Sequence, residues 1–418
     1  MPFTQHPTMS AANASSAAMT RPERASGLLT LAAMLVAIVL ANSPLKPIYD
    51  AVHHTPVGLS VGTWQIDRPL ILWINEGLLV FFFVLVALEI KREVLVGHLA
   101  SRARAALPLA AAVGGMVVPA ALYLVFNGQD AAAARGWPIP MATDTVLALA
   151  ALHALGARVP GAVVAFLTAS AIFDDLGAIA VLALLFSESI SLPALLAAVA
   201  ATLALLLLNR LGISRLSAYL LAGLALWAAV LASGVHATVA GFIIGLAVPL
   251  RTRGPARSPL RALEQGLRPW VALVIVPVFA LFNAGIRLVD LAPGAVSVAV
   301  VAGTVAALVI GKPAGILGAA WLASRLGLAQ RPPGVQWRHI AGAALLAGIG
   351  FTMSLFFAGL AFGPRDALTA SATLGVMLGS LLSAGAGLAF LIGTSGRPDR
   401  RSRSLSNAVA GAATKDPR

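Results

Sequence analysis

The stretch Thr168-Ala-Ser-Ala-Ile-Phe-Asp174-Asp175-Leu-Gly-Ala-Ile-Ala-Val-Leu182 places two adjacent carboxylates inside an apolar run of about 25 residues that begins at Pro160. A helix of roughly 20 apolar residues crosses a bilayer, so both aspartates would lie near the middle of a membrane span. A charged side chain at that depth costs roughly 2.5–3.5 kcal/mol on insertion scales. Two such residues side by side therefore predict an ion or proton site.

The whole chain has the composition of a membrane protein. Of its 418 residues, 59% are hydrophobic and only 11% are charged, and the mean hydropathy is +0.90. Long apolar segments recur along the chain, which predicts a polytopic helical protein, whereas an outer-membrane barrel needs short alternating strands. Because the sequence contains no cysteine, disulfides, thiolate metal sites and cysteine nucleophiles are excluded.

Twelve membrane spans are expected, so the predicted fold class is an all-α polytopic membrane protein. The expected ranges are 25–43, 70–90, 106–126, 138–154, 161–186, 193–209, 216–231, 235–249, 268–284, 295–322, 339–362 and 370–393. They predict a polar N-terminal tail (1–24), one transmembrane domain (25–393) and a basic C-terminal tail (394–418). The first run also has features of a signal peptide, but the many hydrophobic segments after it favour an uncleaved span.

The distribution of arginine between loops predicts the orientation. The formal charge is +13, and the arginines are spread over short loops, which indicates a topogenic role and not nucleic-acid binding. Alternate loops are always the richer ones, and they lie on the same side as both termini. The most basic of them carries Arg251, Arg253, Arg257 and Arg261. By the positive-inside rule, that side is cytoplasmic. No phosphate-binding glycine loop is evident, which argues against a nucleotide-driven pump.

Two of the expected spans are interrupted. The segment Trp137-Pro-Ile-Pro-Met-Ala-Thr-Asp144 contains two prolines, which break a helix, and Ala347-Gly-Ile-Gly-Phe-Thr-Met353 is rich in glycine. Broken backbone at membrane depth is tolerated only where it lines a cavity or is buried in protein. Interrupted segments at corresponding places in two halves of a chain mark the substrate site of a transporter. Kinks that serve helix packing alone are the alternative.

The polar side chains in these spans predict a cation site. Lys312 lies within a long apolar region and needs an anionic partner; a lysine that reaches the membrane interface is the alternative. Hard alkali cations prefer oxygen ligands. Such oxygens are supplied by Thr143, Asp144, Asp174 and Asp175. Protonation of a carboxylate removes the charge that attracts the cation, so protons and cations compete for the same oxygens, as an antiporter requires.

A second group of charges lies near the expected cytoplasmic edge. Glu89 and Glu93 are one turn apart on one helix face, and Glu264 and Arg268 stand at the start of another span. His236 lies near the opposite face, and histidine titrates near physiological pH. From composition alone, interfacial charge pairs and a helix-end histidine are the alternative to a sensing role.

At these residues the sequence resembles the NhaA-type bacterial sodium/proton antiporters over about residues 25–393. The motifs that carry the resemblance are Trp73-Ile-Asn-Glu-Gly77, Leu88-Glu-Ile-Lys-Arg-Glu93, Pro140-Met-Ala-Thr-Asp-Thr145, Phe173-Asp-Asp-Leu-Gly177, Gly234-Val-His-Ala-Thr238, Gly311-Lys-Pro313 and Gly348-Ile-Gly-Phe-Thr-Met-Ser354. The resemblance implies inverted repeats, two interrupted helices that cross, and exchange of one sodium or lithium ion for two protons. It also implies an inner-membrane location, a homodimer in lipid, and no cofactor.

The resemblance further implies roles for individual residues. It places Asp174 and Asp175 at the ion site. It places Thr143 and Asp144 on the crossing of the interrupted helices, and makes Lys312 the charge partner of the site. The pH-sensing residues that it implies are Glu89, Glu93, Glu264 and His236.

The chain departs from the family pattern at three positions. Gln265 and Arg268 stand where some members have histidines, and Glu76 stands where some have aspartate. These departures bear on the pH midpoint and on the dimer contacts, and they leave the implied transport residues unchanged.

Two other functions are alternatives to exchange. A sodium-coupled symporter of an organic solute would need polar groups that recognise the solute, and the mid-span residues show no surplus of them. A membrane receptor or scaffold would not depend on the three mid-span aspartates. Antiport explains the buried carboxylates, the lone buried lysine and the two interruptions together.

Overall fold

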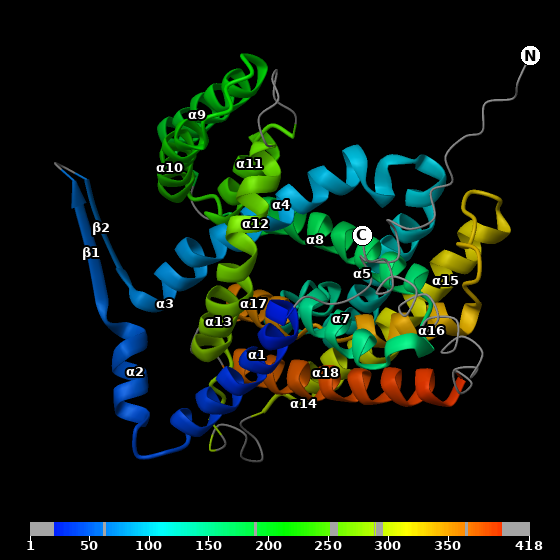
Figure 1. Cartoon of the computed structure of the whole chain (residues 1–418). Helices are drawn as coiled ribbons and strands as arrows, with labels where there is room; N and C mark the ends of the chain where they lie inside the picture. The colour runs from blue at the N-terminus through cyan, green and yellow to red at the C-terminus, as the bar shows by residue number, and fades with distance from the viewer. Residues whose placement is uncertain are drawn as a thin grey trace, which may run out of the picture.

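The computed structural model describes residues 21–61, 64–187, 190–250, 258–287, 289, 296–363 and 367–394, which are almost entirely helical (Figure 1). Among these residues, eight helices are long and apolar enough to cross a membrane, and two bent helix pairs bring the number to ten. Two shorter apolar helices complete a helical counterpart for each of the twelve expected spans. Parts of the expected tails lie outside the described residues, namely 1–20 and 395–418. So do three arginines of the most basic loop: Arg251, Arg253 and Arg257.

The N-terminal part contains a feature that the sequence analysis treated as a loop. Helix α1 (Arg21–Ala41) starts within the expected tail and turns by 111° into α2 (Lys46–His54). The antiparallel hairpin of β1 (Pro56–Val61) and β2 (Trp64–Pro69) follows, with Pro56 opposite Pro69. An apolar residue at every second position of β1 was the signal that could have predicted it. Over the described residues, the fold is therefore all-α apart from this hairpin.

The remaining helices alternate between long spans and short pieces. They are α3 (Leu70–Trp73), α4 (Leu79–Val96), α5 (Arg102–Asn127), α6 (Ala131–Ala134), α7 (Thr145–Ala154), α8 (Gly161–Leu185), α9 (Leu192–Arg210), α10 (Leu216–Ser233), α11 (Thr238–Ala247), α12 (Pro259–Trp270), α13 (Val276–Asn283), α14 (Val298–Ala306), α15 (Lys312–Arg325), α16 (Trp337–Ala347), α17 (Phe351–Phe362) and α18 (Ala367–Thr394). Five-residue π-helical turns join α3 to α4, α12 to α13 and α14 to α15, so each pair forms one continuous span.

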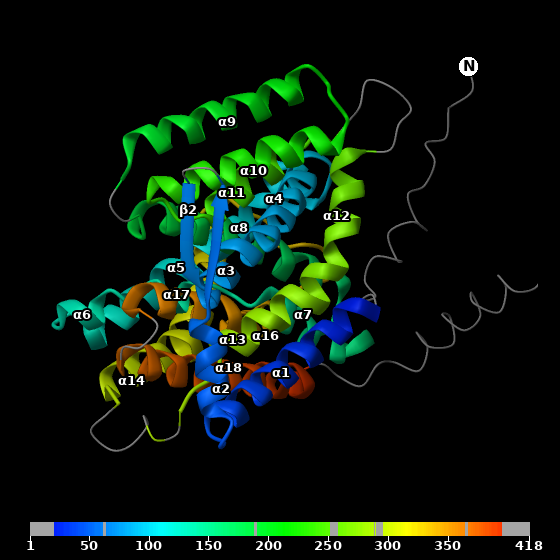
Figure 2. The ribbon, with the colours of Figure 1, turned by 90° about the vertical axis from the view of Figure 1, so that its left-hand side faces the viewer.

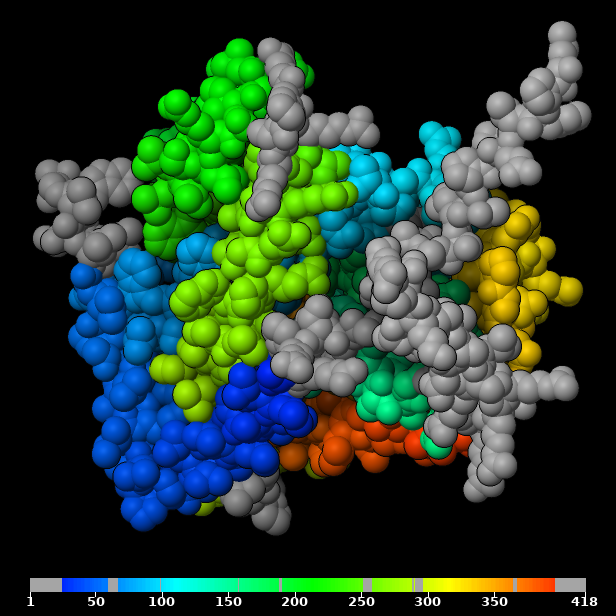
Figure 3. All heavy atoms as spheres, viewed as in Figure 1, coloured from blue at the N-terminus to red at the C-terminus, as the bar shows by residue number. Residues whose placement is uncertain are grey.

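The helices differ in how deeply they lie in the molecule. Helices α9 and α10 stand at one edge in both ribbon views, beyond α4 and α11 (Figures 1 and 2). In the space-filling view, α12 and α13 cover the face between α1 and the α9–α10 pair (Figure 3). In an apolar stretch of 18 residues in α9, only 11% of the stretch is buried inside the protein. In the corresponding stretch of α8, which carries the aspartate pair, 56% is buried. The predicted ion site is therefore on a central helix.

Helices α5 and α15 touch backbone to backbone. A Cβ atom added to Gly114 would lie 2.1 Å from the backbone oxygen of Gly315, and one added to Gly315 would lie 2.0 Å from that of Gly114. Small residues allow membrane helices to approach this closely. Since Lys312 begins α15, this contact fixes the position of the buried lysine.

Candidate functional site

Two breaks in the chain meet in the interior of the protein. The first is the extended segment that leads into α7, and the second is Gly348–Gly350, where α16 and α17 are bent by 45°. The N–H of Asp144 donates to the backbone oxygen of Ile349 over 2.6 Å. The hydroxyl of Thr143 lies 3.1 Å from the backbone oxygen of Ala347, 204 residues away in sequence. The two interruptions expected from the sequence therefore lie against each other.

Asp144 binds the N-termini of two half-helices at once. Its Oδ1 accepts the N–H of Leu147 in α7 over 3.0 Å. Its Oδ2 accepts the N–H and the hydroxyl of Thr352 in α17, over 3.1 and 2.7 Å. Helix N-termini carry unpaired N–H groups and a partial positive charge. The Asp144 carboxylate, which is only 3% exposed, therefore satisfies both ends.

Lys312 supplies the opposite charge on the other side of the crossing. It is fully buried, and its ammonium group donates to the backbone oxygen of Met141. Met141 ends a 3₁₀ turn, and carbonyl groups at such an end carry partial negative charge. The ammonium group also lies 3.5 Å from Oδ2 of Asp174. The lysine thus has the anionic partner that the sequence analysis expected and does not reach the surface.

The two adjacent aspartates of α8 have different surroundings. Oδ2 of Asp174 accepts the hydroxyl of Thr143 over 2.7 Å and faces Lys312. Oδ1 of Asp174 has no hydrogen-bond partner among the described residues. Asp175 is 8% exposed. Consecutive helical side chains point about 100° apart, so only one of the pair faces the lysine. The carboxylate oxygens available to an alkali cation here are Oδ1 of Asp174 and those of Asp175.

Hydroxyl groups on α18 contact the second break and the π-helical turn that leads into α15, and neither contact was expected from the sequence. Thr352 lies within the glycine-rich motif but was not singled out. On α18, the hydroxyl oxygen of Ser380 accepts the N–H of Gly350 over 3.3 Å. One turn later, Ser383 donates to the backbone oxygen of Leu308 over 3.4 Å. The spacing of the two serines on one face of an apolar helix was the only signal available in the sequence.

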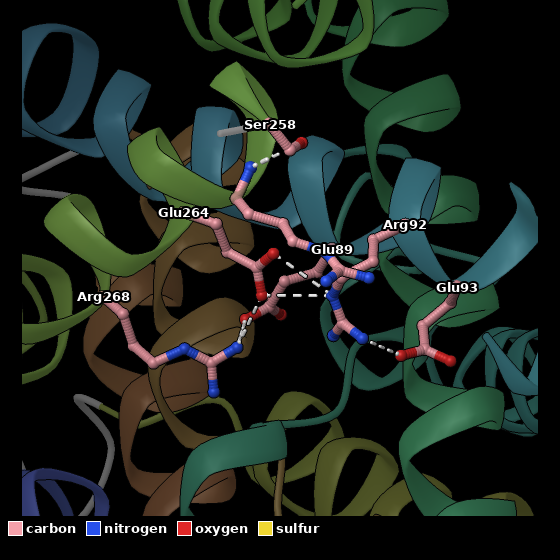
Figure 4. Close-up of polar contacts among 7 residues, drawn as sticks. Glu89, Arg92, Glu93, Ser258, Glu264 and Arg268 are labelled. Atoms are coloured by element: carbon pink, nitrogen blue, oxygen red, sulfur yellow. Dashed lines mark hydrogen bonds and ion pairs between the residues drawn. The ribbon is translucent and has the colours of Figure 1, made fainter. Parts of the chain in front are cut away.

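The three glutamates expected to form a sensing cluster are joined by two arginines (Figure 4). Arg92 Nε lies 3.2 and 3.1 Å from the two oxygens of Glu264, and Arg92 Nη1 lies 2.6 Å from Glu93. Arg268 Nη2 lies 2.8 Å from Glu264 and 2.9 Å from Glu89. Glu264 comes from α12 and the other glutamates from α4. The cluster therefore ties these two helices together.

The same motif on α4 also holds the end of another helix. Lys91 donates to the backbone oxygens of Leu246 and Val248 over 2.6 and 2.7 Å. Asn209 donates to the backbone oxygen between them, that of Ala247, over 2.5 Å. These bonds satisfy carbonyl groups that the end of α11 leaves free.

His236 lies apart from the glutamate cluster, just before α11. Its Nδ1 lies 2.7 Å from the hydroxyl of Thr238. Its ring meets that of Phe356 edge-on, with the ring centroids 5.3 Å apart. Phe356 lies one turn beyond Thr352 on α17. His236 therefore contacts the half-helix that Asp144 caps, and does not contact the glutamates.

Comparisons with known proteins identify the family to which the chain belongs. A sequence model of the family described as Na+/H+ antiporter 1 matches residues 17–391. The chain is 47% identical over 377 residues to the Na(+)/H(+) antiporter NhaA of Pseudomonas putida, covering 90% of this chain and 96% of the relative. It is 48% identical over 389 residues to NhaA of Maricaulis maris, covering 91% and 93%. It is 46% identical over 372 residues to NhaA of Yersinia enterocolitica, covering 89% and 95%.

Proposed function

We propose that this chain, which belongs to the Na+/H+ antiporter 1 family, exchanges sodium ions for protons as a secondary transporter. The observation that carries the proposal is the buried pair Asp174–Asp175 beside Lys312, at the place where two broken helices cross. We place this multi-pass bacterial protein in the inner membrane with both termini in the cytoplasm, because the arginine-rich loops lie on that side. The proposal includes a homodimer in lipid, as the family resemblance implies, and no nucleic-acid partner.

The exchange follows from competition at the aspartate pair. Two adjacent ionised carboxylates repel each other, so either protons or a cation must accompany them in the interior. When Asp174 and Asp175 are ionised, their oxygens bind sodium, which prefers such ligands. When they are protonated, the charge that holds the ion is gone and sodium leaves. Lys312 pairs with Asp174 and so balances the site when it holds no cation.

The finer properties belong to the same proposal. Two carboxylates allow two protons to be exchanged for one sodium ion, which moves one net charge per cycle and makes transport electrogenic. Lithium would use the same oxygens. Glu89, Glu93 and Glu264 in their arginine network, together with His236 on the other side, regulate the response to pH. The transporter would thereby control internal pH and internal sodium.

The test is the substitution Asp175→Asn measured in everted membrane vesicles with a pH-sensitive dye. We expect sodium-dependent dequenching to be abolished, because the amide cannot exchange a proton for a cation. The matched control is Asp67→Asn, which removes an exposed carboxylate on β2 and should leave the rate unchanged. Exchange by Asp175→Asn at the wild-type rate would refute the assignment. Charge movement recorded in proteoliposomes would test the two-to-one stoichiometry.

A further inference from the structure

Ser170 lies one turn before Asp174 on α8, and its hydroxyl group is buried without a partner. The residue is 4% exposed, and its Oγ makes no hydrogen bond to the described residues. Burying a hydroxyl group without a partner costs about 1–3 kcal/mol. Such groups in a native interior therefore call for an explanation, and a bound water or ion is the usual one.

Several other helical hydroxyl groups among the described residues have a partner on their own helix. Thr30, Thr202, Ser324 and Ser371 each donate to the backbone oxygen four residues earlier, over 2.8–2.9 Å. This bond is the common choice for serine and threonine inside a membrane helix. Ser170 does not make it, so its hydroxyl group has no partner among the described residues and can turn its oxygen toward another group.

Asp174 presents the second unpaired oxygen. Thr143 and Lys312 both engage its Oδ2, whereas its Oδ1 has no partner within the described ranges. Side chains at positions i and i+4 of a helix are neighbours about 5–6 Å apart at Cβ, and the later one leans toward the earlier. Cation–oxygen distances for Ca²⁺, an ion of similar size to Na⁺, are about 2.3–2.6 Å. One cation can therefore contact both unpaired oxygens.

We propose that Ser170 is a further oxygen ligand of the transported sodium ion, which it binds together with Oδ1 of Asp174. This inference rests on the proposed function and adds to the site a residue that the acidic motif and Thr143 do not include. A proton needs only one carboxylate oxygen, whereas a sodium ion needs several oxygens at once. Ser170 therefore strengthens sodium binding without strengthening proton binding.

The test compares four proteins in proteoliposomes: wild type, Ser170→Ala, Ser170→Thr and Thr304→Val. Thr304 is the matched control because its hydroxyl group is also buried and unpaired among the described residues, but it lies on α14 against Gly375. We expect Ser170→Ala to raise the apparent KM for sodium about 10-fold, a loss of about 1.4 kcal/mol in binding. Its kcat at saturating sodium should stay near the wild-type value, Ser170→Thr should restore the KM, and Thr304→Val should not change it.

Titration calorimetry of the purified protein with sodium chloride gives an independent measure of the same loss. If Ser170→Ala fails to fold, Ser170→Cys replaces the oxygen by a sulfur that hard cations bind poorly at nearly the same volume. A KM and a sodium Kd within twofold of wild type in the folded variant would overturn the role of Ser170. If the wild type is active and Asp175→Asn is inactive, that result leaves the proposed function standing. A wild-type protein without sodium-dependent proton flux would instead reject the proposed function itself.

Discussion

The contact between α5 and α15 allows a quantitative test of how packing places the ion site. The substitution Gly315→Ala adds a Cβ atom that would lie 2.0 Å from the backbone oxygen of Gly114, whereas ordinary contacts begin at 3.4 Å. The backbones must therefore separate by about 1.4 Å, the difference between these two distances. Neither atom belongs to the far end of a flexible side chain, so the strain cannot be relieved by a change of rotamer.

This displacement acts on the ion site because Lys312 lies three residues from Gly315 on the same helix. A shift of about 1 Å in a reacting group can reduce a rate by roughly 100-fold. Overpacking a core costs about 1–3 kcal/mol, more than the roughly 1 kcal/mol by which alanine favours a helix over glycine. We therefore expect Gly315→Ala to lower the exchange rate by about 10- to 100-fold and to lower the melting temperature.

The assay is the initial rate of sodium-dependent proton release per molecule in proteoliposomes, with thermal unfolding measured on the same preparation. Gly318→Ala is the control, because a Cβ atom there meets nothing within 4 Å on the same helix. It should keep the wild-type rate and equal or exceed the wild-type melting temperature. A Gly315→Ala protein with unchanged rate and unchanged melting temperature would show that this contact does not position Lys312.

Two further substitutions test the contacts around the site. Thr352→Val removes one of three hydrogen bonds to Asp144 and should cost about 1.5–3 kcal/mol of stability, seen as a lower melting temperature in detergent; an unchanged value would contradict the capping role. Arg268→Ala removes the guanidinium group that joins Glu264 of α12 to Glu89 of α4. If this cluster regulates exchange, the pH of half-maximal exchange should change while the maximal rate is kept. The control is Arg261→Ala, which removes an exposed arginine on the same helix. If both variants give the same pH profile of exchange, that result would argue against a sensing role.

The charged part of the site was predictable because ionised residues and prolines stand out in an apolar sequence. Asp144, Asp174 and Lys312 were named from the sequence, and the structure brings them to one crossing. Apart from that of Thr143, the hydroxyl groups were not predictable in the same way. Serine occurs throughout membrane helices and usually bonds to its own backbone, so only the three-dimensional contacts separate Ser380 and Ser170 from the others.

The boundaries of the helices were less predictable than the places of the apolar segments. The span expected at 268–284 begins at Pro259, because Ser258 accepts the N–H of Arg261 and proline fits the first position of a helix. The first turns of this helix are amphipathic, so they are not recognised as part of a span when the sequence is read for apolar runs. The span expected at 138–154 keeps only ten helical residues, since its prolines stop the helix before Thr145.

One carboxylate neutralises the positive ends of both α7 and α17. Pulling these half-helices apart would leave at least one set of N–H groups without an acceptor in a medium that offers no water. The pair must then travel as a rigid unit. Alternating access would come from other helices tilting relative to that unit.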